Sequence, residues 1–297
     1  MNTCIKLIER NVKLFFKDKG MLLTSLLTPI ILLILYATFL ANVYHNSFTE
    51  SIPNSIHISE AVIDGVVAGQ LMSSLLAVSC VTVAFSSNFL MVQDKANGTI
   101  KDFNTSPVKS STLSLSYYIA TLISTFIICI IATCACLGYV YIKGWYMSTS
   151  DVIMLFIDVI LLILFGTALS SAINFFLTTQ GQIAAVGTMI GAGYGFICGA
   201  YMPISSFSEG IQKAMMFLPG TYGTSLVRNH SMNGALEELS KEGMPNTIMT
   251  SIKDVLDLNL YFFDKRVEIA TMYLILGITV ALLLTAYILL NKFKKAN

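Results

Sequence analysis

Six runs of about 20 or more predominantly apolar residues divide this 297-residue sequence, and they restrict its possible folds more than any other feature. The hydrocarbon core of a bilayer is about 30 Å thick, which a helix of about 20 apolar residues crosses. Inside lipid, backbone amides need partners within the protein, so spans of this kind form helices. We therefore expect an all-α polytopic membrane protein with six transmembrane helices, built as one domain over residues 1–297. The runs cover about residues 22–41, 66–92, 115–142, 152–177, 183–202 and 267–290.

The composition fits a chain embedded in a bilayer and argues against several classes of function. Hydrophobic residues make up 55% of the chain and charged residues 12%, about half the charged share of a soluble domain. A formal net charge of +1 provides no basic face for nucleic acid, so no nucleic-acid partner is expected. The six cysteines include no CxxC pair, which argues against a metal site. The absence of HExxH and GxSxG motifs predicts no catalytic residues on this chain.

The Lys and Arg residues indicate the orientation of the spans. Eleven of them lie in residues 1–21, 93–114 and 291–297, whereas segments 42–65 and 143–151 contain only Lys143. Short cytoplasmic segments carry the excess of positive charge in membrane proteins. The sequence therefore predicts a multi-pass plasma-membrane protein with both termini in the cytoplasm.

Residues 1–20 precede the first apolar run and show a helical pattern. Ile5, Ile8, Val12 and Phe15 recur at helical spacing, and charged residues occupy the other faces. This pattern is typical of an interfacial helix that lies on the cytoplasmic leaflet of the lipid bilayer. Two interpretations stay open: a basic anchor that only sets the topology, or a docking surface for a partner protein.

The cytoplasmic loop 93–114 contains the stretch QDKANGTIKDFNTSPVKSS. Gly98 and Thr99 predict a turn followed by a helix start, and Pro107 predicts the end of that helix. Ile100 and Phe103 are three residues apart and would place two apolar side chains on one face. The segment is either a connecting loop or a short helix that offers this apolar face to another protein.

Residues 203–266 follow the fifth run and are expected to lie outside the cell. Pro203 and Pro219 bound a short apolar segment, in which Ser206 and Glu209 form a capping-box pattern that predicts a helix start. Such a helix fits a re-entrant element, which is tolerated at membrane depth only where protein or water surrounds it. The more polar residues 232–266 predict an outer cap with one further amphipathic helix.

The loop 93–114 and the segment 203–266 resemble the corresponding parts of the membrane subunits of type-2 ABC exporters. This permease family includes bacterial exporters of drugs, polysaccharides and lipids. The stretches YMPISSF and FLPGTY are similar to its re-entrant helices, with Pro219 and Tyr222 at the Pro and Tyr positions of the family. In the same family, an acidic residue, a Gly-Thr pair, an apolar residue and a later Pro-Val pair mark the coupling helix. The matching residues here are Asp94, Gly98, Thr99, Ile100, Pro107 and Val108.

The resemblance implies a division of labour between subunits. The coupling helix and the N-terminal helix would contact a separate ABC ATPase, which would bind ATP and Mg, and two permeases would pair as copies or paralogues. The sequence has no GxxxxGK(S/T) phosphate-binding loop, so we expect no cofactor on this chain. The expected function is ATP-driven export of an amphipathic, drug-like or lipid-like substrate. An ion-coupled secondary carrier or a channel without an ATPase partner is the alternative.

Gly187, Gly191, Gly195 and Gly199 recur at every fourth position of the fifth run. On a helix they would form a slowly winding groove, because four residues exceed one turn by about 40°. A neighbouring helix can approach such a groove closely. The pattern predicts either static helix packing or a span that moves against its neighbours and lines the pathway.

Asp158 lies within the fourth run, about 10 Å below the expected outer interface. An intramembrane carboxylate suggests proton coupling or cation recognition, unless hydration or pairing with Lys143 accounts for it. Gln70, Asn88 and Asn174 are expected to form hydrogen bonds between helices. These residues are the candidates for polar function or polar packing inside the bilayer.

Overall fold

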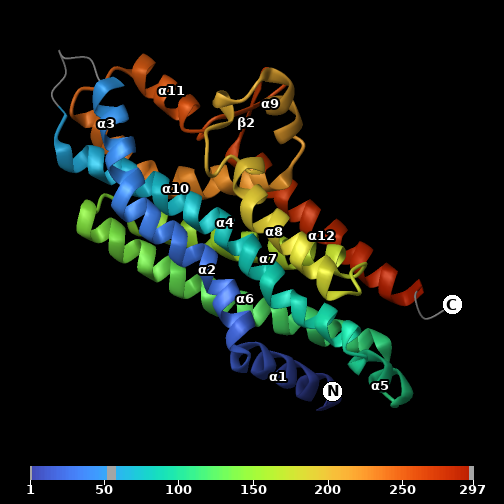
Figure 1. The fold of residues 1–297 in the computed structure, drawn as a ribbon. Helices are drawn as coiled ribbons and strands as arrows, with labels where there is room; N and C mark the ends of the chain where they lie inside the picture. Colours follow the sequence, from blue (N-terminus) through green and yellow to red (C-terminus); the bar gives the residue numbers. More distant parts are fainter. Residues whose placement is uncertain (1, 52–57, 294–297) are drawn as a thin grey trace.

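The computed structural model describes residues 2–51 and 58–293, which fold almost entirely into helices (Figure 1). The helices of the first half are α1 (Asn2–Lys17), α2 (Lys19–Leu35), α3 (Ala41–Ser51), α4 (Glu60–Ala96), α5 (Thr99–Thr105) and α6 (Ser110–Lys143). Those of the second half are α7 (Thr149–Asn174), α8 (Gln180–Ile197), α9 (Glu209–Met215), α10 (Pro219–Lys241), α11 (Asn246–Val255) and α12 (Ile269–Phe293). A π-helical turn, Tyr36–Leu40, joins α2 to α3, and a 3-10 turn, Ile204–Ser206, precedes α9. The strands β1 (Leu260–Phe262) and β2 (Lys265–Val267) form a small antiparallel hairpin in this helical fold.

Five helical stretches of the described chain are long and apolar enough to cross a bilayer. They are Lys19–Asn46, Glu60–Ala96, Ser110–Lys143, Thr149–Asn174 and Ile269–Lys292. The predicted fifth run, 183–202, forms α8, which has 18 residues and ends at Ile197. At 1.5 Å per residue α8 is about 27 Å long, shorter than a hydrocarbon core of about 30 Å. The chain is a multi-pass membrane protein, and the count of six spans stays a prediction.

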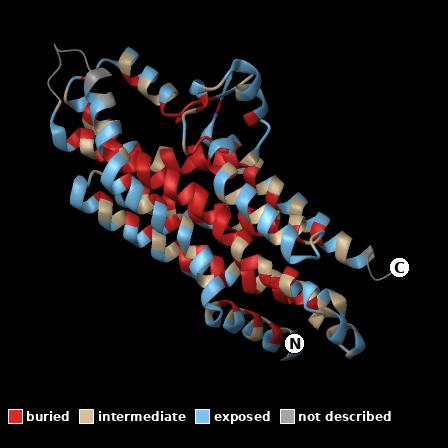
Figure 2. Cartoon of the chain, viewed as in Figure 1, coloured by how far each residue is buried: buried red, intermediate tan, exposed pale blue. Residues whose placement is uncertain are grey.

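Helix α4 lies at the centre of the bundle and is buried along most of its length (Figure 2). It packs against α2, α6, α7, α8 and α10. A Cβ on Gly69 of α4 would lie 2.7 Å from the carbonyl oxygen of Ser231 in α10. A Cβ on Gly166 of α7 would lie 2.8 Å from the carbonyl oxygen of Cys80 in α4. These glycines let two helices contact α4 backbone to backbone, as small residues do in membrane proteins.

The glycines of α8 do not form one continuous packing groove, because two of them shape the end of the helix. Gly199 has φ 72°, and its amide donates to the carbonyl of Phe196. The amide of Ala200 donates to the carbonyl of Gly195 at 2.8 Å, which completes a Schellman motif. The ring of Tyr201 folds back onto Gly195, 2.4 Å from where a Cβ would stand. The packing prediction is therefore corrected for Gly195 and Gly199, which accommodate the reversal of the chain after α8.

The segment 203–266 contains a longer helix than the sequence indicated. The expected helix start at Ser206 is wrong, because Ser206 belongs to the 3-10 turn and α9 begins at Glu209. Pro219 does not end a helix but opens α10, because the first turn of a helix does not need the amide hydrogen that proline lacks. α10 has 23 residues and packs against α4, α7 and α12. Beyond α10 the segment contains α11 and the β1–β2 hairpin.

We expect Gly69→Leu to destabilise the bundle, because the new side chain would meet the backbone of α10. Overpacking of this kind costs about 1–3 kcal/mol, which exceeds the gain in helix propensity of about 1 kcal/mol. Gly138→Leu on α6 is the matched control, since a Cβ there meets no atom of the described chain within 4 Å. The apparent melting temperature in detergent should fall for Gly69→Leu alone. An equal fall for both substitutions would contradict this account of the packing around α4.

Candidate functional site

Arg10 of α1 reaches into the bundle and binds Asp94 near the end of α4. Arg10 Nη1 donates to Asp94 Oδ2 at 2.8 Å, and the Tyr117 hydroxyl of α6 donates to the same oxygen at 2.5 Å. Burial lowers the pKa of Arg10, but the hydrogen bond and negative charge of Asp94 help to outweigh it, so the net shift is upward. Asp94 is only 7% exposed. It therefore holds α1 against α4 and α6, and its carboxylate is not presented to a partner protein.

Helix α5 turns its apolar side chains toward the bundle. Gly98, with φ 83°, precedes the helix in the left-handed region that glycine tolerates. Ile100 and Phe103 are half-buried and pack against the core, and the Arg10 guanidinium lies 5.2 Å from the centroid of the Phe103 ring. These two side chains therefore contact the bundle, and the interpretation that they also contact another protein stays a prediction. The exposed residues in and just after α5 include Lys101, Asp102, Thr105 and Pro107.

Lys95, the residue after Asp94, connects the C-terminal end of α4 to the C-terminal end of α7. Its Nζ donates to the carbonyls of Asn174, Phe175 and Leu177 at 3.0, 2.7 and 3.1 Å. The last carbonyls of a helix lack partners within it, and a cation there also complements the helix dipole. From successive positions, Asp94 and Lys95 therefore fix α1 and the α7–α8 connection to one point on α4.

A cleft of about 700 Å³ lies between α2, α4 and α8. Gly187 and Gly191 line it on the side of α8. A Cβ on Gly187 would lie 3.3 Å from the ring of Phe89, whereas one on Gly191 would meet no atom of the described chain within 4 Å. Gln93 also lines the cleft, directly before Asp94. The wall mixes hydroxyl groups with apolar side chains, among them Thr24, Leu27, Thr28, Thr82, Phe85, Ser86, Ile183, Thr188 and Ile190.

Asp158 of α7 is buried and bonded to two other helices. Its Oδ2 lies 2.6 Å from His230 Nδ1 of α10, and the Tyr273 hydroxyl of α12 donates to its Oδ1. Pairing with Lys143 is not observed, because Lys143 Nζ lies 3.7 Å from Asp64 Oδ2. The sequence did not indicate the contact with His230, since residues 203–266 were expected to lie outside the cell. Asp158 joins α7, α10 and α12 and lies outside the lining of the cleft.

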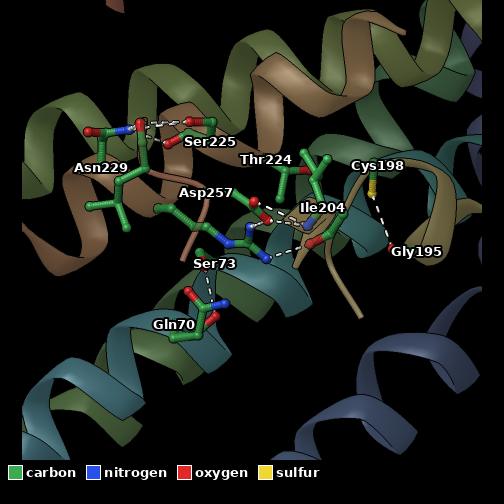
Figure 3. Close-up of polar contacts among 12 residues, drawn as sticks. Gln70, Ser73, Gly195, Cys198, Ile204, Thr224, Ser225, Asn229 and Asp257 are labelled. Carbon is green, nitrogen blue, oxygen red and sulfur yellow. Dashed lines mark hydrogen bonds and ion pairs between the residues drawn. The ribbon is translucent and has the colours of Figure 1, made fainter. Parts of the chain in front are cut away.

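A buried ion pair connects α10 to the segments around the end of α8 (Figure 3). Arg228 Nη1 donates to Asp257 Oδ2 at 2.8 Å, and its Nη2 donates to the Gly199 carbonyl at 2.6 Å. The amide of Ile204 donates to both carboxylate oxygens of Asp257. Arg228 is 1% exposed, so removal of either charge would leave the other buried and unpaired. The pair therefore fixes the chain between α8 and α9 onto α10.

The three residues assigned to re-entrant helices position α9 and α10. Pro203 precedes the 3-10 turn, and Pro219 opens α10. The buried Tyr222 donates its hydroxyl to the carbonyl of Met216 at 2.5 Å, which closes the connection between the two helices. The depth of α9 and α10 in a bilayer stays a prediction.

Comparison with known proteins identifies a family for this arrangement. The family model described as ABC-2 type transporter matches residues 3–230, which is more than half of the chain. The match includes α1, α5 and the cleft, and it ends within α10. The remainder of α10, α11, the hairpin and α12 lie beyond the matched range. No curated protein matches the chain.

The substitutions Arg10→Met and Asp94→Asn should destabilise the protein non-additively. Each removes the same charge-assisted hydrogen bond, which contributes about 1.5–3 kcal/mol, so a double-mutant cycle should give a coupling energy of about 1–2 kcal/mol. Chemical denaturation in detergent measures it. The exposed pair Glu9 and Lys13 serves as control, with Glu9→Gln and Lys13→Met expected to couple by less than about 0.5 kcal/mol. Coupling near zero between Arg10 and Asp94 would mean that this pair does not hold α1.

Proposed function

The chain belongs to the ABC-2 type transporter family, and we propose that it is the permease subunit of an exporter driven by a separate ABC ATPase. One observation supports this most directly: three successive residues of α4 meet three parts of the molecule. Gln93 lines the cleft, Asp94 binds α1 and Lys95 binds the end of α7. A displacement of α1 would therefore be transmitted through packed helices and ion pairs to a wall of the cleft.

The ATPase would dock on the surface formed by α1 and the exposed side of α5. Lys101 and Asp102 provide charges on α5, and Lys13 and Lys17 provide charges on α1. The sequence has no GxxxxGK(S/T) loop, so ATP and Mg would bind to the partner. Closure of the ATPase would push α5, and α4 would follow because Gly98 is the only residue between α5 and the C-cap of α4.

The cleft supports an amphipathic cargo. Its volume of about 700 Å³ lies within the range of about 300–1,000 Å³ of pockets that bind drug-sized molecules. The hydroxyls of Thr28 and Ser86 can hydrogen-bond to a polar group, and Phe89 and Leu27 offer apolar surface. We therefore propose a drug-like or lipid-like molecule as the exported substrate.

A second permease, either a copy of this chain or a paralogue, would complete the pathway. The faces of α2 and α8 beside the cleft carry exposed apolar side chains, among them Leu23 and Leu27 of α2 and Met189 of α8. A partner packed against both faces would enclose the cleft, and Gly191 would allow its close approach. The distribution of Lys and Arg supports a cytoplasmic location for both termini.

No specific observation favours the ion-coupled carrier. A carrier of that class uses an ionisable residue on its substrate or ion pathway. Asp158 is bonded to His230 and Tyr273 and lies outside the lining of the cleft. Asp18 does line the cleft, but its carboxylate caps α2 by accepting from the amides of Gly20 and Met21.

Affinity purification of the tagged chain from its native membrane tests the proposed partnership. A soluble ATPase should co-purify in mild detergent, and the eluate should hydrolyse ATP. Lys101→Glu combined with Asp102→Lys reverses two exposed charges of α5 and should remove the ATPase. Glu238→Lys combined with Lys241→Glu makes the same reversal on α10 and should retain it. Purification of an intact membrane complex without an ATPase would contradict the proposal.

Gly191→Phe should obstruct the cleft without disturbing the fold, because no described atom lies within 4 Å of a Cβ at that position. In a variant without Cys4 and Cys134, Thr28→Cys places a thiol in the cleft wall that a water-soluble maleimide can label. Gly191→Phe should slow this labelling several-fold, whereas the control Gly138→Phe should leave it unchanged. Equal labelling rates in all three backgrounds would show that α8 does not border the space next to Thr28.

A further inference from the structure

A second cavity, of about 420 Å³, lies between α9, the end of α11 and the β1–β2 hairpin. These elements are at the end of the molecule away from α1 and α5 (Figure 1). Most of the side chains that line the cavity follow residue 230, beyond the range matched by the family model. The cavity is therefore a feature of this chain outside the shared domain.

Carboxylates dominate the charge of the cavity. Of those in its lining, Asp257 is paired with Arg228 at 2.8 Å, and Glu209 lies 3.8 Å from Lys213. Asp254 and Asp264 also line the cavity, and neither forms an ion pair within the described chain. Two negative charges thus remain without a cationic partner from the described residues.

Asn259 provides an independent indication of what the cavity binds. The residue is 5% exposed and lines the cavity, and its Nδ2 donates to Asp254 Oδ1 at 2.7 Å. That bond fixes the orientation of the amide, because only the nitrogen can donate to a carboxylate. Its Oδ1 is buried and accepts no hydrogen bond from the described residues. Since buried polar atoms are almost always satisfied, a hydrogen-bond donor is missing from this wall.

Aromatic side chains form another part of the lining. Tyr261, Phe262 and Phe263 border the cavity, and the rings of Phe262 and Phe263 lie 4.9 Å apart in an edge-to-face contact. Phe263 and Asp264 have φ of 45° and 67°, an unfavourable conformation for a bulky side chain such as Phe263. The hairpin turn therefore maintains backbone strain at Phe263, beside the cavity.

We propose that this cavity binds an organic cation, a primary or secondary amine that carries an apolar group. Its ammonium would donate to Asn259 Oδ1 and neutralise Asp254 and Asp264, and its apolar group would lie against the aromatic rings. Among the described residues, no group of three His, Cys, Asp or Glu is placed to hold a metal ion. The donor set therefore fits an amine better than a divalent cation.

Calorimetric titration of the purified chain in lipid nanodiscs tests this site with 2-phenylethylammonium as the probe. The native chain should bind the probe, and Asp254→Asn with Asp264→Asn should weaken binding about tenfold or more. Asparagine tolerates the positive φ of residue 264, so the hairpin should keep its shape. Glu237→Gln with Glu238→Gln removes two carboxylates of α10 outside the cavity and should leave the affinity unchanged.

Three comparisons decide the chemistry of the ligand. The neutral 2-phenylethanol should bind much more weakly than 2-phenylethylammonium, and added NaCl should weaken the binding of 2-phenylethylammonium. Equal binding of the alcohol, or unchanged binding by the Asp254 and Asp264 double variant, would overturn the proposal. Displacement of the probe by millimolar Ca²⁺ at constant ionic strength would also overturn it, in favour of a metal site. The titration uses the chain without an ATPase, so its outcome is independent of the proposed transport function.

Discussion

The close packing of α4 is the constraint on which the rest of the structure depends. α2, α6, α7, α8 and α10 pack against it, and at Gly69 and Gly166 the approach leaves no room for a side-chain carbon. In a bilayer, helices gain little from apolar burial alone, so close backbone contact and buried hydrogen bonds must supply the attraction. α4 combines both, because Asn88 donates to the hydroxyls of Ser170 and Ser171 on α7. On the proposed mechanism, a helix held in this way would move as a rigid unit together with whatever is attached to its end.

An ion pair with a buried carboxylate lies toward each end of the bundle. At one end, Asp94 and Lys95 attach α1 and the end of α7 to α4, next to Gln93 in the wall of the cleft. At the other end, the ion pair of Arg228 and Asp257 fixes the chain after α8 onto α10. Breaking either arrangement would leave a buried charge without compensation, which is costly in a low-dielectric interior. Buried carboxylates are thus central to both arrangements, Asp94 at one end and Asp257 at the other.

Much of the helical architecture was predictable, because apolar runs report directly on membrane helices. The hydrogen bonds of Asn88 to α7 were also predictable, since an amide in an apolar run needs a partner on a neighbouring helix. The same prediction is wrong for Asn174, whose side-chain nitrogen and oxygen are buried without a hydrogen-bond partner among the described residues, and Gln70 Oε1 is also unsatisfied there. The interior placement of α10 was not, because its polar residues and Pro219 are typical of an exposed segment, and only the tertiary contacts of Arg228 and His230 explain their burial. The sequence also could not show that the side chains of Ile100 and Phe103 face the bundle, because a spacing of three residues defines a helix face but not whether that face turns inward. The second cavity was not predictable either. It is lined by Asn259 and by a hairpin turn without glycine, and no sequence pattern indicated that turn.

The most direct test of the central claim measures whether ATPase closure moves α4 at the wall of the cleft. In the complex with the proposed ATPase, Ser86→Cys on α4 would be labelled with maleimide without nucleotide and again after trapping with ATP and vanadate. The account predicts that trapping changes the labelling rate, and that Lys95→Met abolishes this change while the ATPase stays bound. A labelling rate that trapping leaves unaltered in the native background, or a response that survives Lys95→Met intact, would contradict transmission through the end of α4.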